Sequence, residues 1–285
     1  MSKKTLTIAV LSAFILTACG HSHHRDTTGG NGYVVNFTNN SGDTASSNNT
    51  PFEMKEQFTS FTIENKDGKQ VASSKTSMTA EEQLQLQQII KSIDPDAAAQ
   101  NDTDKGFYSA EYQLDEKNIA GKLFLGATNG ERGTAYAKYG IDLQVPTIDG
   151  ENTTKLQLFY TGEETEAMPT TGKVTYLGKA IASTPEAMVN TGELGNYYGD
   201  SSFQVDFDSK KLTGTLNNWQ VTNTTQPAMQ AVNIEADIKA NTFQGTANSS
   251  GYAEGKFYGP DAANIAGSFD DKDQKLFGVF GANKQ

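Results

Sequence analysis

The C-terminal part of the chain contains eight short runs of alternating apolar and polar residues, and this pattern constrains the fold more than any other feature. Turn residues separate the runs. The runs are Lys173–Ile181, Ser202–Asp208, Lys211–Trp219, Ala231–Ile238, Thr242–Ala247, Ala253–Tyr258, Asn264–Phe269 and Lys275–Phe280. Eight closely spaced strands of this kind predict an antiparallel sandwich or a small barrel.

Glycines inside these runs favour the barrel. They are Gly178, Gly214, Gly245, Gly255, Gly267 and Gly278. A glycine costs stability in a strand, so repeated use marks bends or bulges, as at the corners of a tight barrel. An eight-stranded barrel is just wide enough for side chains to fill it, so we expect a plugged barrel. The alternate positions Gln204, Asp206 and Asp208 are polar, so they do not supply the outward apolar band of a transmembrane barrel.

Residues 51–168 form a block of mixed pattern. A strand is predicted within Phe52–Glu64, before a turn signal at Asn65–Gly68. Thr79 and Glu82 have the spacing of a capping box, and the helix that they open would end at Asp94, before Pro95. Further strands are predicted at Gly106–Gln113, Lys117–Ala127, Gly133–Gln144 and Thr154–Tyr160. The chain is therefore expected to be mainly β with a small helical part.

An acidic segment without periodicity, Glu163–Thr171, marks the predicted domain boundary. We place an N-terminal domain at 51–168 and the barrel at 169–285. Glu163, Glu164 and Glu166 are interpreted as solvated linker residues rather than as a catalytic carboxylate pair.

The N-terminus has the anatomy of an export signal. Lys3 and Lys4 precede an apolar stretch, Leu6–Leu16, that is too short to span a bilayer permanently. The sequence Leu16-Thr17-Ala18-Cys19 follows and resembles a bacterial lipobox. We predict that residues 1–18 are a lipoprotein signal peptide and that Cys19 carries the lipid. The alternative is an ordinary signal with an incidental cysteine.

Residues 19–50 are rich in Gly, Asn, Ser and Thr, a composition that cannot bury enough apolar surface to fold. They are predicted to be a flexible tether. One patch, Tyr33–Phe37, is interpreted as an added edge strand rather than as a sticky spot. His21, His23 and His24 lie in the first tether residues and are interpreted as solvated, so no metal site is predicted.

The distribution of histidine and cysteine argues against an enzyme. The chain has 3 His and 1 Cys, and none of them follows His24. Ser-His-Asp and Cys-His catalysis and His/Cys zinc sites are therefore excluded from the predicted domains. The chain also lacks a Ser-x-x-Lys motif and a phosphate-binding P-loop. Its net charge of −11 makes nucleic acid a poor partner. No enzyme activity and no cofactor are predicted.

Several stretches of the barrel resemble the transferrin-binding protein B family. Gly172–Ala180 is similar to the opening strand of that family's barrel, and Phe203–Gly214 to its second hairpin. Phe257–Phe269, with its Gly259-Pro260 turn, and the closing run Leu276–Ala282 also resemble the family. The resemblance implies an N-terminal "handle" domain packed beside an eight-stranded barrel. Single-lobe relatives include hemophilin-type haem or haemoglobin binders and factor H-binding proteins.

The resemblance also implies a location and partners. It points to a lipoprotein exposed on the outer membrane, carried there by a Slam-type translocator. The leading hypothesis is that it binds host haemoglobin or haem for iron acquisition and delivers it to a TonB-dependent receptor. This chain would have one lobe, whereas transferrin-binding protein B has two, and that difference argues against transferrin itself as the ligand. The second hypothesis is capture of a complement regulator such as factor H for immune evasion, and the third is a lipid-anchored envelope protein or enzyme.

Candidate ligand contacts are aromatic. Tyr197 and Tyr198 form the best aromatic cluster and fall in the predicted link between the first two barrel strands. Tyrosines in an exposed loop favour protein recognition, and a tyrosine could also ligate haem if haem is the ligand. The alternative is that the pair packs over the barrel mouth. Tyr136 and Tyr139, in the N-terminal block, are open to the same two interpretations.

Overall fold

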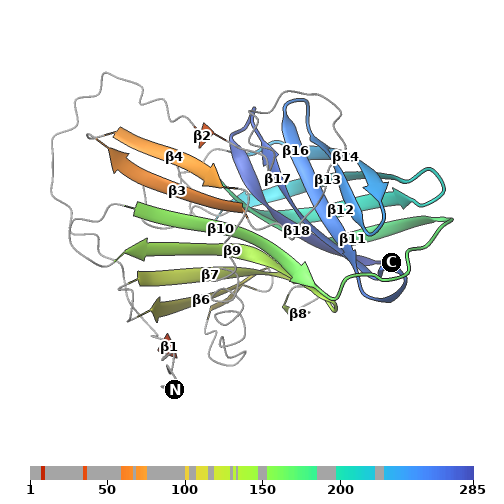
Figure 1. Cartoon of the computed structure of the whole chain (residues 1–285), viewed down its shortest axis with the longest axis horizontal. Helices are drawn as coiled ribbons and strands as arrows, with labels where there is room; N and C mark the ends of the chain where they lie inside the picture. Colours follow the sequence, from red (N-terminus) through yellow and green to blue (C-terminus); the bar gives the residue numbers. More distant parts are fainter. Residues whose placement is uncertain are drawn as a thin grey trace, which may run out of the picture.

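A computed structural model of the chain (Figure 1) is built almost entirely from β-strands in the residues that it describes. These are residues 107–114, 119–128, 131–132, 134–146, 153–184, 197–221 and 228–285, with short strands at 8–9, 35–36, 59–66, 69–75 and 100–102. The mainly β prediction is confirmed. The helix expected to begin at Thr79 lies outside the described residues.

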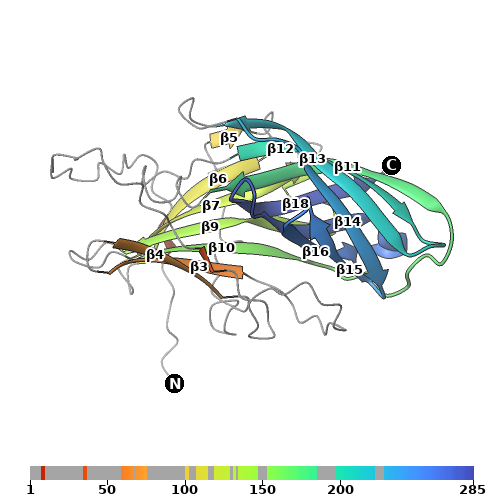
Figure 2. The ribbon, with the colours of Figure 1, turned by 90° about the horizontal axis from the view of Figure 1, so that it is seen from above.

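The C-terminal eight strands close into an antiparallel barrel in chain order, with the last strand paired to the first (Figure 2). They are β11 (Lys173–Ser183), β12 (Tyr197–Asp206), β13 (Lys211–Val221), β14 (Val232–Lys239), β15 (Thr242–Ala247), β16 (Gly251–Tyr258), β17 (Asn264–Asp271) and β18 (Leu276–Lys284). All eight predicted strands are therefore present. A short 3₁₀ turn, η3 (Pro260–Ala262), connects β16 to β17.

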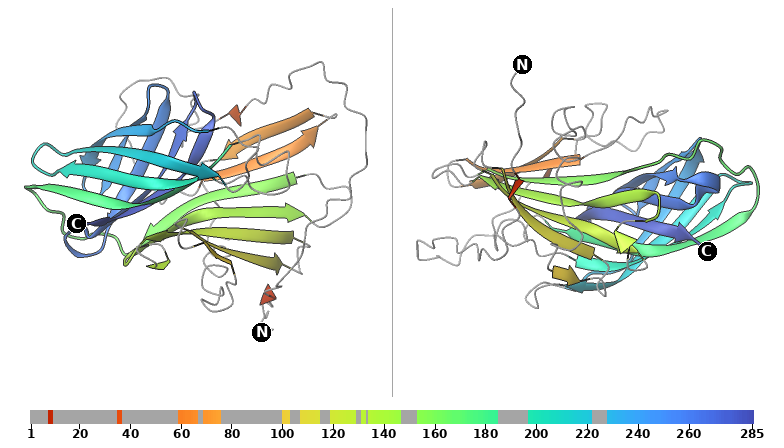
Figure 3. Two further views of the ribbon diagram at one scale, coloured as in Figure 1. Left: turned by 180° about the vertical axis from the view of Figure 1, so that it is seen from behind. Right: turned by 90° about the horizontal axis from the view of Figure 1, so that it is seen from below.

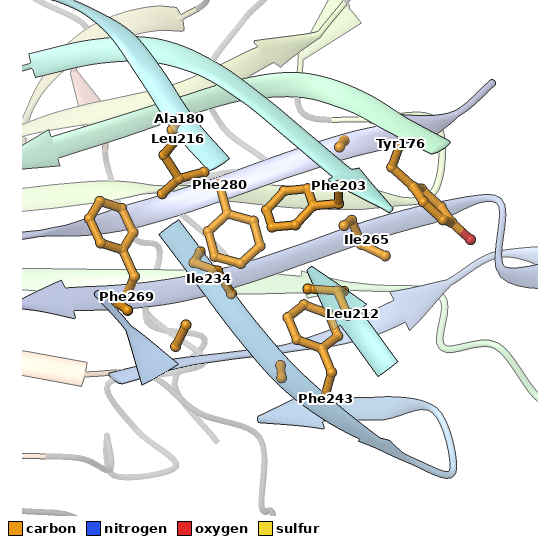
Figure 4. Close-up of a cluster of buried hydrophobic side chains, with 14 of the residues drawn as sticks. Tyr176, Ala180, Phe203, Leu212, Leu216, Ile234, Phe243, Ile265, Phe269 and Phe280 are labelled. Carbon is orange, nitrogen blue, oxygen red and sulfur yellow. The ribbon is translucent and has the colours of Figure 1, made fainter. Parts of the chain in front are cut away.

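Aromatic and aliphatic side chains fill the barrel interior (Figure 4). Phe203 packs on Phe280 with ring centroids 4.9 Å apart, and Phe280 in turn stacks on Phe243. The predicted plug is thereby confirmed. Two of the strand glycines have a role that differs from the expected bends: a Cβ at Gly214 would lie 2.1 Å from the Phe203 ring, and one at Gly255 would lie 2.3 Å from Phe243. These glycines make room for the rings.

The N-terminal strands form one sheet that lies against the barrel (Figure 3). Its main strands are β3 (Thr59–Lys66), β4 (Lys69–Lys75), β6 (Phe107–Leu114), β7 (Ile119–Thr128), β9 (Ala137–Pro146) and β10 (Thr153–Gly162). Short strands β1 (Ile8–Ala9), β2 (Val35–Asn36), β5 (Gln100–Asp102) and β8 (Glu131–Arg132) flank them. We call this sheet the handle. Its order is β1-β6-β7-β9-β10-β3-β4-β2, so β2 is an edge strand, as expected for the Tyr33–Phe37 patch.

A second apolar cluster lies between the handle and the outside of the barrel, and we call it the joint. Its members from the handle are Phe107, Phe124, Ala137, Tyr139, Ile141, Leu143, Leu158 and Tyr160. Those from the barrel are Ile181, Tyr198, Tyr258, Ala266, Phe277 and Val279. Because each strand presents alternate residues to opposite faces, β11, β17 and β18 are apolar both inside the barrel and on the side facing the handle.

Candidate functional site

The joint holds the handle and the barrel in one arrangement through close packing. The buried ring of Tyr139, on β9, lies against Gly281 of β18 and Gly126 of β7. A Cβ at Gly281 would lie 2.2 Å from this ring, and one at Gly126 would lie 1.9 Å from it. No side chain larger than glycine fits at either position without displacing the tyrosine. Tyr139 is therefore a packing residue that fixes the handle on the barrel wall.

Both tyrosines predicted as ligand contacts are buried strand residues. The prediction that Tyr197 and Tyr198 lie in an exposed link is wrong, because β12 already begins at Tyr197. Tyr197 is 0% exposed inside the barrel, whereas Tyr198 is 5% exposed in the joint, 5.6 Å from the Phe107 ring. Their neighbours Gly199, Asp200 and Ser201 are residue types that are typical of turns, although here they belong to β12. The structure places the pair in two cores and not on a surface.

Tyr136 lies just before β9, where the handle reaches the turn that follows β16. Its half-buried ring packs on Gly259, where a Cβ would lie 2.4 Å from a ring carbon. Gly259 has φ of 74°, a left-handed conformation that favours glycine. The backbone N–H of Tyr136 donates to Asn264 Oδ1 at 2.9 Å. Tyr136 thus helps to fix the far end of the joint.

The segment that links β10 to β11 is attached to the barrel. The Lys256 amine is 2.6 Å from Glu164 Oε1, and Asn241 donates to the other oxygen at 2.9 Å. The next residue, Thr165, is buried and donates from Oγ1 to the Gly259 carbonyl at 2.7 Å. Glu164 is exposed, as interpreted from the sequence, but its ion pair with the barrel was not expected. Hydrogen bonding from Lys256 is the main reason that the pKa of Glu164 lies below its usual value.

One carboxylate lies at the joint. Glu254, on the outer face of β16, is 3% exposed. Its oxygens accept hydrogen bonds from two tyrosines, Tyr252 on the same strand at 3.1 Å and Tyr160 of the handle at 3.4 Å. Burial raises the pKa of Glu254 to about 7. No sequence signal indicates this site, because the burial of Glu254 depends on Tyr160, 94 positions earlier in the chain.

Trp219, the chain's single tryptophan, was not singled out from the sequence. It is half-buried near the end of β13 and packs on Phe269, with ring centroids 6.1 Å apart. The register of β12 and β13 shifts here, and Asn218 has φ of 54°. A bulge of this kind re-aims the following side chain, here toward the barrel core. The Asn218 amide donates to Asp200 at 2.7 Å, which holds the bulge.

Within the part of the chain that the structure describes, no group of three or more His, Cys, Asp or Glu side chains is placed to hold a metal ion. The acidic run Asp270–Asp273 spans the end of β17 and the start of the turn that leads to β18. Asp271 Oδ1 accepts the backbone N–H groups of Asp273 and Gln274 at 3.1 and 3.4 Å. The described residues also contain no helix with the length and apolar character needed to cross a membrane.

The fold is thus a filled barrel braced by a sheet, the class of rigid scaffold on which loops carry recognition. Residues 168–284 match the family model described as "C-lobe and N-lobe beta barrels of Tf-binding protein B". Over these residues the chain is thus similar to the barrels of the transferrin-binding protein B-like family, and the resemblance seen in the sequence is confirmed. Proteins of this family bind other molecules and are not enzymes, which agrees with the predicted lack of activity.

Individual relatives agree with this assignment. The chain is 35% identical over 126 residues to transferrin-binding protein B of Moraxella catarrhalis, covering 36% of this chain and 17% of that protein. It is 38% identical over 132 residues to an uncharacterized protein of Haemophilus influenzae, covering 44% of this chain and 42% of that protein. It is 33% identical over 93 residues to the heparin binding antigen of Neisseria meningitidis, with coverage of 30% and 18%. The matches thus span less than half the length of each relative.

Two solved structures show looser likeness. One is the N-lobe of lactoferrin binding protein B of Moraxella bovis, at 16% identity and a TM-score of 0.46, covering 81% of this chain and 100% of that one. The other is transferrin binding protein B of Neisseria meningitidis, at 19% identity and a TM-score of 0.46, covering 81% and 54%.

Proposed function

We propose that this chain is a lipoprotein of the bacterial outer membrane, displayed on the cell surface, that binds a host protein. The match of residues 168–284 to the family barrel carries the proposal, because the named relatives are binding proteins. The structure supports it with a rigid frame. A filled barrel fixed to a handle can hold recognition loops in place with little ordering entropy to lose on binding.

The leading ligand in this proposal is haemoglobin, acquired for its iron. Several relatives are named for transferrin, which also carries iron, so haemoglobin would supply the same nutrient by another route. Heparin, named in another relative, is a polyanion and suits a chain of net charge −11 poorly. Free haem is a weaker candidate than the whole protein, because all three histidines precede residue 25 and both Tyr197 and Tyr198 are buried.

Direct binding separates the ligands. The mature chain, residues 19–285, is immobilised and challenged with haemoglobin, apo-globin, haemin, transferrin and factor H at physiological salt. Retention of haemoglobin at micromolar concentration or below supports the leading proposal. Retention of factor H instead supports immune evasion, the second hypothesis. If none of the five is retained, both the haemoglobin hypothesis and the factor H hypothesis are contradicted.

The anchor is a proposal that is tested separately. Cys19 is expected to carry the lipid, and a Slam-type translocator is expected to move the protein to the surface. Cys19→Ser should release the protein from membranes into the soluble fraction, because acyl chains provide the attachment. Deletion of a Slam-type gene should leave the lipidated protein inaccessible to protease on intact cells. Membrane retention of Cys19→Ser would contradict the lipid anchor.

A further inference from the structure

The handle is buried on both of its faces, and we call the face that points away from the joint the back face. Neighbouring residues of a strand point to opposite sides, so Leu123 and Leu125 of β7 lie on the other side from Phe124, which belongs to the joint. Leu123 is 0% exposed and Leu125 is 3% exposed. Phe159 of β10 is also 0% exposed, and none of these three belongs to either apolar cluster of the described residues. The back face therefore needs a cover other than the barrel.

Polar side chains are buried on the same face. Asp142 of β9 is 0% exposed, and it pairs in register with Leu123 on one side and with Gln157 of β10 on the other. Gln157 is 2% exposed. Gln144, at 8% exposure, donates to Asp142 Oδ2 at 2.8 Å. One row across the sheet is thus polar on β10 and β9 and apolar on β7, and all of it is covered.

The residues between β4 and β5 have to pass from one side of this sheet to the other. β4 lies near one edge, whereas β5 pairs with β6 at the opposite edge (Figure 1). The crossing starts at Lys75, which pairs with Ser60 of β3 and so continues the buried row. It ends at Gln100, which pairs with Ser109, one position from the same row. The straight path between the two ends therefore runs along the buried row, and the barrel occupies the other face.

The length of this connection fits the path as a helix. Six strand spacings of about 4.8 Å separate β4 from β5, which gives about 29 Å. The sequence predicts a helix over residues 79–94, a segment that lies outside the described residues. Such a helix is about 24 Å long, and the residues on either side of it supply the rest of the distance. Residues 76–99 as one extended strand would span about 79 Å, far more than the crossing needs.

The residue pattern of the predicted helix matches the row beneath the path. Its first turns are polar, with Glu81, Glu82 and Gln83. An apolar stripe at three- and four-residue steps follows, made of Leu86, Ile89, Ile90 and Ile93. A helix that enters from β4 would place its polar turns near β10 and its stripe near β7 and β6. This is the order in which the row changes from polar to apolar.

We propose that the back face is the docking surface for residues 79–94 of this same chain. The segment crosses the sheet as a helix from β3 toward β6 and buries its apolar stripe on Leu123, Leu125 and Phe159. It thereby ties the two edges of the handle together. The back face is then not available to a host protein, a membrane or a second copy of the chain. The proposal concerns the handle alone and does not depend on the identity of a ligand.

Methyl NMR of the full-length wild-type protein in mild detergent tests the contact without any variant. Isoleucine and leucine methyl groups are labelled and assigned. Nuclear Overhauser effects are expected between the methyl groups of Ile89 or Ile90 and those of Leu123 or Leu125, because packed side chains touch. The proposal is overturned if the stripe shows no such effect to either leucine.

Hydrogen exchange on the same protein measures what the contact contributes. Ile90→Ala removes part of the stripe, so peptides of β7 and β10 should lose protection by about tenfold or more. Peptides of β13 and β14 in the barrel should change by less than about twofold. Gln88→Ala is the matched control on the opposite side of the predicted helix, and it should leave β7 and β10 within about twofold of the wild type. Equal losses in the two variants would contradict the proposed orientation.

A double variant tests the pairing of the two surfaces. In Ile90→Ala with Leu123→Ala, the combined loss of protection should be at least about threefold smaller than the product of the single losses. Gln88→Ala with Leu123→Ala should show the product within about twofold. Other occupants would give a different result. If Ile90→Ala leaves protection unchanged but abolishes self-association or binding to vesicles of phosphatidylethanolamine and phosphatidylglycerol, the stripe serves a second copy or a membrane, and the proposal is wrong.

Discussion

The barrel interior and the joint are both buried, but they differ in chemistry. The interior cluster of 23 buried residues includes only two tyrosines, and its centre is phenylalanine and aliphatic side chains. The joint cluster has 14 buried residues, four of them tyrosines, and lies beside Glu254. The interior is held mainly by apolar packing, whereas the joint also buries tyrosine hydroxyl groups and lies beside a carboxyl group whose pKa is raised by burial. The interior therefore maintains the fold, and the joint sets how firmly the handle is held.

The largest effect is expected in the interior. Phe203→Ala removes a fully buried ring that packs on Phe280 and over Gly214. The cavity should cost about 3–5 kcal/mol in the free energy of unfolding. Urea denaturation followed by Trp219 fluorescence measures it. A loss under about 1 kcal/mol would show that the interior is not closely packed.

A smaller effect is expected at the joint, with a different pattern. Gly281→Ala places a methyl group against the Tyr139 ring and should cost about 1–3 kcal/mol. Because Gly281 faces the handle, protection from hydrogen exchange should fall in β9 and β10 before it falls in the barrel strands. Uniform loss across both parts would mean that handle and barrel do not separate as units. In the double variant with Tyr139→Ala, the total loss of stability should be smaller than the sum of the two single losses, because the added methyl group no longer meets a ring.

The ion pair of the linking segment should contribute less. Glu164→Gln should cost about 0.5–1 kcal/mol at pH 7, because the carboxylate is 44% exposed and its pair is screened by water. The pKa of Glu164 is lowered, chiefly by the Lys256 hydrogen bond, so its stabilisation is present at neutral pH and is lost as the pH falls below 4.5. Denaturation at pH 7 and pH 3.5 should show the difference only at pH 7.

The smallest effect is expected outside both cores. Leu177, on the outer face of β11, is 44% exposed, and Leu177→Ala should change stability by less than about 0.5 kcal/mol. Urea denaturation of this variant, beside Phe203→Ala, provides the baseline for the comparison. A cost above 1 kcal/mol would indicate that this face is covered.

The barrel could be predicted from the sequence because its order is local. Each strand alternates, as in Phe203-x-Val205-x-Phe207, and turn residues such as Asp208 and Ser209 separate neighbours in chain order. The prediction started β12 five residues late, because Gly199, Asp200 and Ser201 resemble a turn. Pairing with β11 and β13 outweighs that local preference and buries Tyr197 and Tyr198.

The joint could not be predicted in the same way, although a signal was present. Ala180-Ile181-Ala182 and Leu276–Phe280 are continuously apolar instead of alternating, which is typical of strands buried on both faces. That signal shows that something covers the barrel wall, but not which residues do so. Tyr160, which lies beside Tyr258 and donates to Glu254, is on β10, far away in the sequence. The role of Glu254 therefore appears only in three dimensions.

The central claim, a surface protein that binds a host protein, is tested most directly on intact cells. Cells that carry the gene, cells that lack it and cells with Cys19→Ser are incubated with host plasma supplemented with red-cell lysate, then washed and analysed by mass spectrometry. We predict that only cells with the unaltered gene retain a host protein, with haemoglobin foremost. If cells with and without the gene retain the same proteins, the account of this molecule as a host-protein receptor is contradicted.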